Sequence, residues 1–138
     1  MKKIGIIGSR RRKTKGDFMK ITRVFSRIYE KGDQIVSGGC PKGGDNFAEV
    51  IAKEKGIPIT IYYPNWKEDG KIAGFIRNTE IANNSDILIT CVAEDREGGT
   101  EDTIKKFCKR INNENFLYVA KGERLEEVMI KEGVLILV

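Results

Sequence analysis

Histidine is absent from this 138-residue chain, and with it the commonest general base and the commonest metal ligand of proteins. The sequence therefore excludes catalysis by a Ser-His or Cys-His pair, and it excludes a zinc site with histidine ligands. Any chemistry must use carboxylates, arginine, lysine, hydroxyls or backbone groups. We expect neither a metal nor a cofactor.

Cysteines are few, and long apolar runs are missing. Cys40, Cys91 and Cys108 are odd in number, scattered and without metal-ligand spacing, which indicates a reducing cytoplasm. Met1-Lys2-Lys3 leads directly into a strand too short for the apolar core of a signal peptide. No stretch approaches the ~20 apolar residues of a membrane span. We predict a cytoplasmic protein with no membrane partner.

The length and composition are typical of one globular domain over residues 1–138, with 40% hydrophobic and 33% charged residues. The net charge of +5 is partly concentrated in Arg10-Arg11-Arg12-Lys13 with Lys15. This run favours a solvated loop; the alternative is attraction of an anionic ligand or of nucleic acid.

Short β-branched runs alternate with segments of helical periodicity. Strands are expected at residues 3–8, 34–37, 58–62, 86–91, 116–119 and 134–138. Helices are expected at residues 17–31, 44–55, 71–84, 100–111 and 123–130. Asp17 and Thr100 are expected as N-caps and Gly32 and Gly56 as stops, and Ile72, Ile76 and Ala82 fall along one stripe. Strands separated by helices imply right-handed crossovers. We therefore predict an α/β fold: a single Rossmann-like three-layer domain with a mostly parallel five- or six-stranded sheet.

Three glycine-rich turns each follow a β-branched run. They are Gly8-Ser9-Arg10, Gly38-Gly39 continuing to Gly43-Gly44-Asp45, and Gly98-Gly99-Thr100. Glycines between a strand and a helix leave backbone N–H groups accessible, which suits phosphate or ribose groups. The carboxyl ends of parallel strands meet at one edge of a sheet, so the three turns are expected to line one crevice.

Several of these residues have two interpretations. Gly8 is needed for a tight turn whatever is bound, whereas Ser9 and Arg10 favour a phosphate. Gly43-Gly44, just before a helix, favours a loop that a phosphate or ribose approaches. Asp45 fits either a helix cap or a contact to ribose hydroxyls. Trp66, the only tryptophan, fits stacking on a base or covering the core, and the core is favoured slightly.

The ordered motifs resemble the SLOG superfamily of Rossmann-like domains, in its YspA/YpsA-like branch, related to DprA and to the LOG nucleotide phosphoribohydrolases. The resemblance spans residues 3–112 and rests on Ile7-Gly8-Ser9-Arg10, Val36-Ser37-Gly38-Gly39, Gly43-Gly44-Asp45 with Ala48-Glu49, Trp66, Ala73-Gly74, Arg77-Asn78 and Gly98-Gly99-Thr100. It implies a domain that binds a nucleotide derivative and is often a homodimer. Because the superfamily includes enzymes, ligand sensors and a DNA-binding protein, it implies no single reaction.

The resemblance assigns a catalytic role to Arg77, nine residues before Asp86 and with Asn78 beside it; the alternative is a surface arginine on an amphipathic helix. The LOG signature continues Gly-Thr-x-x-Glu with a catalytic glutamate, but Thr103 occupies that position here. Threonine cannot supply the carboxylate that an oxocarbenium-like state requires. Glu101 and Asp102 are the nearest replacements, and they lie about 200° and 100° around the helix from Thr103.

The same two acids offset the positive end of their helix, which makes the third turn a poor phosphate site. We therefore expect a phosphate near Gly8-Ser9-Arg10 or Gly38-Gly39, and sugar hydroxyls near Gly98-Gly99-Thr100. A dehydrogenase is disfavoured, because the first turn lacks Gly-x-Gly-x-x-Gly and no acid follows the second strand.

Three classes of function remain. The favoured one is a protein that binds or senses a nucleotide-derived ligand. The second is a hydrolase of an N-glycosidic bond that uses Arg77 with Asp45 or Asp102. The third, supported only by the basic run, is a DprA-like nucleic-acid binder.

Overall fold

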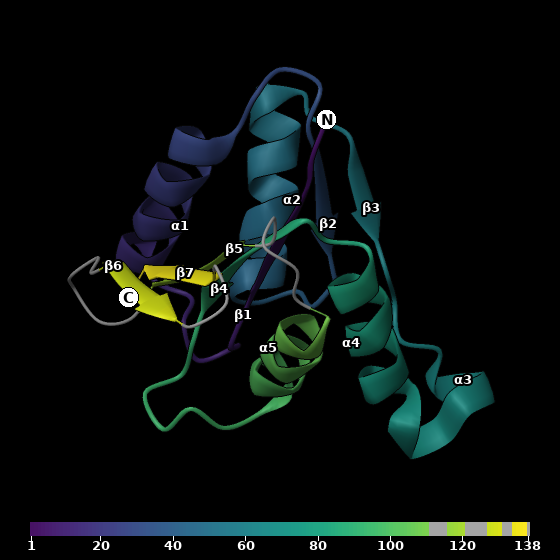
Figure 1. The fold of residues 1–138 in the computed structure, drawn as a ribbon. Coiled ribbons are helices and arrows are strands. Elements are labelled where there is room, and N and C mark those ends of the chain that lie inside the picture. Colours follow the sequence, from purple (N-terminus) through teal and green to yellow (C-terminus); the bar gives the residue numbers. More distant parts are fainter. Residues whose placement is uncertain (111–115, 121–126, 131–133, 138) are drawn as a thin grey trace.

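The computed structural model describes residues 1–110, 116–120, 127–130 and 134–137, with side chains for residues 1–110. A parallel sheet has the strand order β3-β2-β1-β4-β5 (Figure 1). Its strands are β1 (Lys3–Gly8), β2 (Gln34–Ser37), β3 (Ile59–Ile61), β4 (Ile87–Cys91) and β5 (Phe116–Ala120). The fifth strand is described by its backbone pairing with β4. The predicted α/β class with a parallel sheet is confirmed.

Helices cover both faces of this sheet (Figure 1). They are α1 (Lys15–Ile28), α2 (Gly44–Lys55), α3 (Trp66–Asp69), a 3₁₀ turn at Gly70–Ile72, α4 (Ala73–Asn83) and α5 (Gly99–Lys109). Within the described helices, none is long and apolar enough to cross a membrane.

The core consists of two clusters, one on each face, because neighbouring residues of a strand point to opposite sides. Ile35 and Ile89 belong to the cluster beneath α1 and α2, whereas Val36 and Leu88 belong to the cluster beneath α4 and α5. The side chains of these four residues are at most 2% exposed. Both helix pairs are thereby held against strands whose carboxyl ends lie at one edge.

Both predicted N-caps are wrong. Thr14 caps α1: its hydroxyl accepts a hydrogen bond from the Asp17 N–H at 3.1 Å, and the Asp17 carboxylate accepts from the Thr14 N–H at 3.2 Å. Asp17 is thus the third helical residue of a capping box. Thr100 lies inside the first turn of α5, and Gly98 is the N-cap.

One predicted helix stop is confirmed and the other is wrong. Gly56 ends α2 with φ 65°. The first helix ends at Ile28, with Tyr29 extended as C-cap, and Gly32 lies in the following turn at φ 98°. There the Asp33 carboxylate accepts a hydrogen bond from the Glu30 N–H at 2.9 Å, which stabilises the turn instead of another helical turn.

The helix predicted at 123–130 is a second error. Residues 127–130 form strand β6 (Glu127–Ile130), which pairs antiparallel with β7 (Val134–Leu137). The rest of that predicted helix lies outside the described residues. Val128-Met129-Ile130 carries β-branched residues that suit a strand, so pairing with Val134–Leu137 outweighs helical propensity.

Of the apolar stripe predicted over residues 71–84, only Ala82 is buried. Ile72 is 59% and Ile76 is 38% exposed, and the buried residues are Ala73, Asn78, Ile81 and Ala82. The contact between α4 and α5 is made partly through the amide of Asn78. A search for regularly spaced apolar residues does not detect such a polar contact.

Candidate functional site

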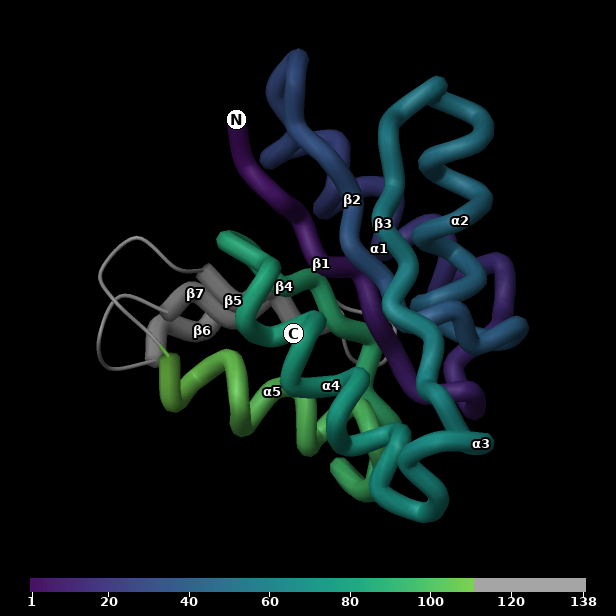
Figure 2. The backbone as a smooth tube through the Cα atoms, turned by 90° about the vertical axis from the view of Figure 1, so that its right-hand side faces the viewer, coloured from purple at the N-terminus to yellow at the C-terminus, as the bar shows by residue number. Residues whose placement is uncertain are grey.

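The three glycine turns line one cavity of about 880 Å³ at the carboxyl ends of the strands. This volume lies in the range of about 300–1,000 Å³ that small-molecule sites occupy. In Figure 2, β1, β2 and β3 run side by side, and α3 lies beyond the end of β3 at this edge of the sheet. The cavity wall includes most of the predicted site residues: Gly8, Ser9, Arg10, Gly38, Gly39, Asp45, Arg77, Asn78, Gly98, Gly99 and Thr100. The predicted convergence of Gly8, Gly39 and Gly99 is therefore present.

Gly39 is required by its own conformation and by a neighbouring ring. Its φ of 76° is one that side chains rarely adopt, and a Cβ there would lie 2.5 Å from Cε1 of Tyr63. The absent side chain thus lets Tyr63, 65% exposed, pack over the turn and line the cavity.

Gly43 and Gly44 lie outside the cavity wall, contrary to the expectation that a ligand approaches them. A Cβ on Gly43 would lie 2.3 Å from the Ser9 carbonyl oxygen, and one on Gly44 would lie 2.1 Å from the Ile7 carbonyl carbon. The first turn of α2 therefore packs directly on the end of β1. These two glycines are explained by close backbone packing between the first and second turns.

Asp45 lies buried in the cavity wall and does not cap α2. Its carboxylate accepts a hydrogen bond from the Cys40 N–H at 3.1 Å, whereas the N-cap Gly43 makes no side-chain cap bond. Burial raises the pKa of Asp45 to about 6, against the opposing effects of the Cys40 N–H and the positive charge of Arg77. The cap interpretation is wrong, and a contact to ribose stays a prediction.

Arg77 projects from α4 into the cavity wall, and does not lie on an open helix surface. Its Nη1 donates to the Gly38 carbonyl at 2.5 Å, and its Nε donates to Oδ1 of Asn78 at 3.0 Å. Helix α4 is thereby tied to the second glycine turn. Its hydrogen bonds leave guanidinium N–H groups available for an anion.

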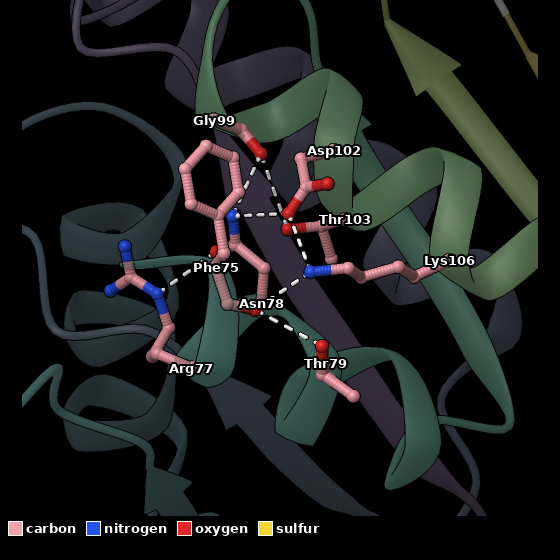
Figure 3. A network of polar contacts seen from close by, with 8 residues as sticks. All are labelled: Phe75, Arg77, Asn78, Thr79, Gly99, Asp102, Thr103 and Lys106. Atoms are coloured by element: carbon pink, nitrogen blue, oxygen red, sulfur yellow. Dashed lines mark hydrogen bonds and ion pairs between the residues drawn. The ribbon is translucent and has the colours of Figure 1, made fainter. Parts of the chain in front are cut away.

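Asn78, Asp102 and Lys106 form a polar network between α4 and α5 (Figure 3). Nδ2 of Asn78 donates to the Gly99 carbonyl at 3.2 Å and to Asp102 at 3.1 Å, and Nζ of Lys106 donates to Asp102 at 2.8 Å. In Figure 3 the Arg77 guanidinium points away from Asp102. Asp102 lies outside the cavity wall and is held by Asn78 and Lys106, which does not favour its predicted catalytic role; that role stays a prediction.

The position of the missing glutamate is buried at the cavity. Thr103 is 2% exposed, lines the wall, and donates from Oγ1 to the Gly99 carbonyl at 3.4 Å. Glu101 is held by Arg96, with Nη2 to Oε2 at 3.0 Å. Within the described residues, the acids of the cavity wall are Asp45 and Glu97, neither of which comes from α5.

Sequence reasoning missed an aromatic wall. Trp66 is 59% exposed at the start of α3, so its predicted place over the core is wrong. It lines the cavity with Tyr63 and Phe75, the latter 55% exposed. Gly74 of α4 lies beside the Trp66 ring, where a Cβ would make an ordinary contact at 3.5 Å. The aromatic run Tyr62-Tyr63-Pro64, directly after β3, was the feature of the sequence that could have predicted this wall.

The basic run divides by role. Arg12 pairs with the buried Asp17 at 2.6 Å and donates to the Val92 carbonyl at 2.9 Å. Arg11 makes a two-pronged contact to Asp95 with both distances 2.7 Å, and the pKa of Asp95 is lowered to about 2 as a result. Arg10 is exposed in the cavity wall.

Comparisons of the chain with family models, with curated proteins and with solved structures returned no match. Within the part of the chain that the structure describes, no group of three or more cysteine and carboxylate side chains could hold a metal ion.

Proposed function

We propose that this cavity binds a nucleotide or a nucleotide-derived ligand, as the resemblance to SLOG domains implies. We propose a binding or sensing role without catalysis because Thr103 stands in place of the glutamate. One observation carries the proposal: three glycine turns from β1, β2 and β4 line the same cavity together with Arg10 and Arg77. The exposed guanidinium of Arg10 and the remaining guanidinium N–H groups of Arg77 suit a phosphate. The Ser9 N–H is already bonded to the Cys91 carbonyl at 2.9 Å, and the Cys40 N–H to Asp45 at 3.1 Å, so the charge of the two arginines is the main attraction.

The cavity has two chemically different sides, which suggests an orientation. Tyr63, Trp66 and Phe75 offer exposed ring surface for a base. Arg10, beside Gly8 and Ser9, offers charge for a phosphate. The ribose then lies between them, within reach of Asp45 and the Gly98-Gly99-Thr100 turn.

The test is isothermal titration calorimetry with AMP, GMP, CMP and UMP. Arg10→Ala and Arg77→Ala are each expected to lose roughly 1.5–3 kcal/mol of affinity, the range of a hydrogen bond to a charged group. Arg23→Ala is the control, since Arg23 is exposed on α1 and outside the cavity wall. Unchanged affinity in both cavity variants, for every nucleotide that the parent binds, would contradict the proposal.

A second candidate is the hydrolysis of an N-glycosidic bond. The buried carboxyl of Asp45, with a pKa of about 6 and in the same cavity wall as Arg77, favours it. Against it stands Thr103 in place of the glutamate. Release of free base from nucleoside monophosphates, abolished by Arg77→Ala, would support this candidate over the binding role.

A further inference from the structure

A second hollow adjoins the cavity, and its charged side chains are all basic. It is lined by Arg10, Arg11, Lys13, Pro41 and Lys42, and is here called the basic hollow. Arg10, Arg11 and Pro41 line both spaces, so the basic hollow opens from the cavity at its phosphate-binding side.

Two separate loops bring these cations together. Lys13 follows β1 and Lys42 follows β2. The loops lie against each other because Gly43 has no side chain: a Cβ there would lie 2.3 Å from the Ser9 carbonyl oxygen and 3.3 Å from the Arg10 Cα. The cluster is therefore set by backbone packing and does not depend on flexible side chains alone.

The positive charge of the basic hollow is largely uncompensated. Arg11 is held by Asp95, but Arg10, Lys13 and Lys42 are exposed and form no ion pair with any described residue. No carboxylate lines the hollow. Like charges held close together repel, and an anion between them removes that repulsion.

We propose that the ligand is a nucleoside diphosphate or an ester of one, with its second phosphate in the basic hollow, held by Arg10, Lys13 and Lys42. This rests on the proposed function. A base on the aromatic wall directs the chain of phosphates toward Arg10, which lines both spaces. The first phosphate then lies at Gly8-Ser9-Arg10, and the next one lies beyond it, between Lys13 and Lys42.

The experiment compares the affinities of AMP and ADP by calorimetry at about 0.15 M salt, where exposed charges more than about 8 Å apart are largely screened while direct contacts remain. The parent is expected to bind ADP about tenfold more tightly, as two further charge-assisted hydrogen bonds allow. The double variant Lys13→Ala/Lys42→Ala is expected to reduce this ratio to about two, since Arg10 alone remains to hold the second phosphate. Lys53→Ala/Lys55→Ala removes the same charge from exposed residues at the end of α2 and is expected to keep the parent ratio.

The possible results separate the two proposals. Equal affinities of AMP and ADP in the parent, or a ratio that the double variant leaves unchanged, overturn the diphosphate inference and leave the proposed function standing. Failure of the parent to bind any of the four nucleoside monophosphates of the first test, or the diphosphate of any of them, overturns both. Binding of single-stranded DNA that needs Lys13 and Lys42, without preference for ADP, assigns the basic hollow to nucleic acid and also overturns the inference.

Discussion

Asp45 gives the fold a pH dependence whose sign is unusual for a carboxylate. Burial raises its pKa from 3.8 to about 6, so the folded state holds a proton that the unfolded state releases between these values. This contribution to stability therefore falls as pH rises from 4 to 6 and is constant above. The same burial makes the group a candidate for proton transfer in the cavity.

Asp45→Asn tests this sign. Asparagine can still accept from the Cys40 N–H but carries no charge. The variant's free energy of unfolding, relative to that of the parent, is expected to rise by about 2–3 kcal/mol between pH 4 and pH 7. Urea titrations at several pH values measure it. Parallel pH profiles of the free energy of unfolding for parent and variant would show that folding does not raise the pKa of Asp45.

Thr103 is where the catalytic question can be tested. We expect the parent to release little or no free base from nucleoside monophosphates, because the α5 carboxylates Glu101 and Asp102 are paired outside the cavity. Thr103→Glu places a carboxylate at the cavity wall and is expected to gain activity, measured by chromatography of the released base.

The matched control for this gain is Thr103→Gln, which has the same size without the charge. Equal rates in both variants would exclude the carboxylate as the missing group. Robust release by the parent that disappears in Arg77→Ala would instead make the protein an enzyme.

Residue by residue, the sequence was informative where a role is set by the backbone. Gly8, Gly39 and Gly99 were placed correctly because strand ends in a parallel sheet share an edge. Trp66 was misplaced because its surroundings depend on the short helix α3, and the ion pair of Asp102 with Lys106 was not foreseen. Both depend on tertiary packing. A local pattern cannot show which acid pairs outside a cavity.

At the scale of elements, the start of α2 is the tightest junction among those described around the cavity. A Cβ on Gly44 would come within 2.1–2.3 Å of backbone atoms of Ile7 and Gly8, which cannot move aside as a side chain can. This contact sets the distance between the first and second glycine turns. It also fixes how the basic hollow is assembled.

Gly44→Ala is therefore expected to destabilise the fold by about 1–3 kcal/mol or more, as other overpacked sites do, measured by urea unfolding. Gly16→Ala is the control, because Gly16 lies in α1 and a Cβ there meets its nearest atom at 3.7 Å. That control is expected to be neutral or stabilising by up to about 1 kcal/mol. Equal effects of both substitutions would show that the backbone of β1 moves aside to accommodate a Cβ on Gly44.

Helices and strands were predicted best where they are long and where residues such as glycine mark both of their ends. Helix α2 was predicted at its observed bounds, since Gly43-Gly44 and Gly56 mark both ends. The four residues of α3 are too few to show a helical period, and the start of α1 was missed because Thr14 and Asp17 act reciprocally. Residues 127–130 illustrate the ambiguity of short apolar runs, which only pairing resolves.

For the whole molecule, the strand order β3-β2-β1-β4-β5 explains why the cavity forms where it does. The chain moves outward from β1 in one direction through β2 and β3, then returns to the other side of β1 at β4. Loops leaving β1 and β4 therefore diverge to opposite faces, and the space between them is the crevice typical of such sheets. That space was predictable from alternation alone, whereas its aromatic wall was not.

The homodimer that the resemblance implies stays a prediction, and α4 offers the surface for it. Ile72 of the 3₁₀ turn and Ile76 of α4 are 59% and 38% exposed, and both lie outside the cavity wall that Trp66 and Phe75 line. Exposed apolar side chains that gather on neighbouring elements mark interaction surfaces, whereas single ones do not. We therefore expect this corner of α3 and α4 to contact a second copy of the chain.

Ile72→Asp tests the dimer without altering the cavity wall, which does not include Ile72. The charge would be buried in the interface, so we expect sedimentation velocity to show a dimer for the parent and a monomer for the variant. Met19→Asp is the matched control, because Met19 on α1 is also 59% exposed but stands apart from this corner. A parent that sediments as a monomer at tens of micromolar, or equal dissociation in both variants, would remove α4 as the dimer surface.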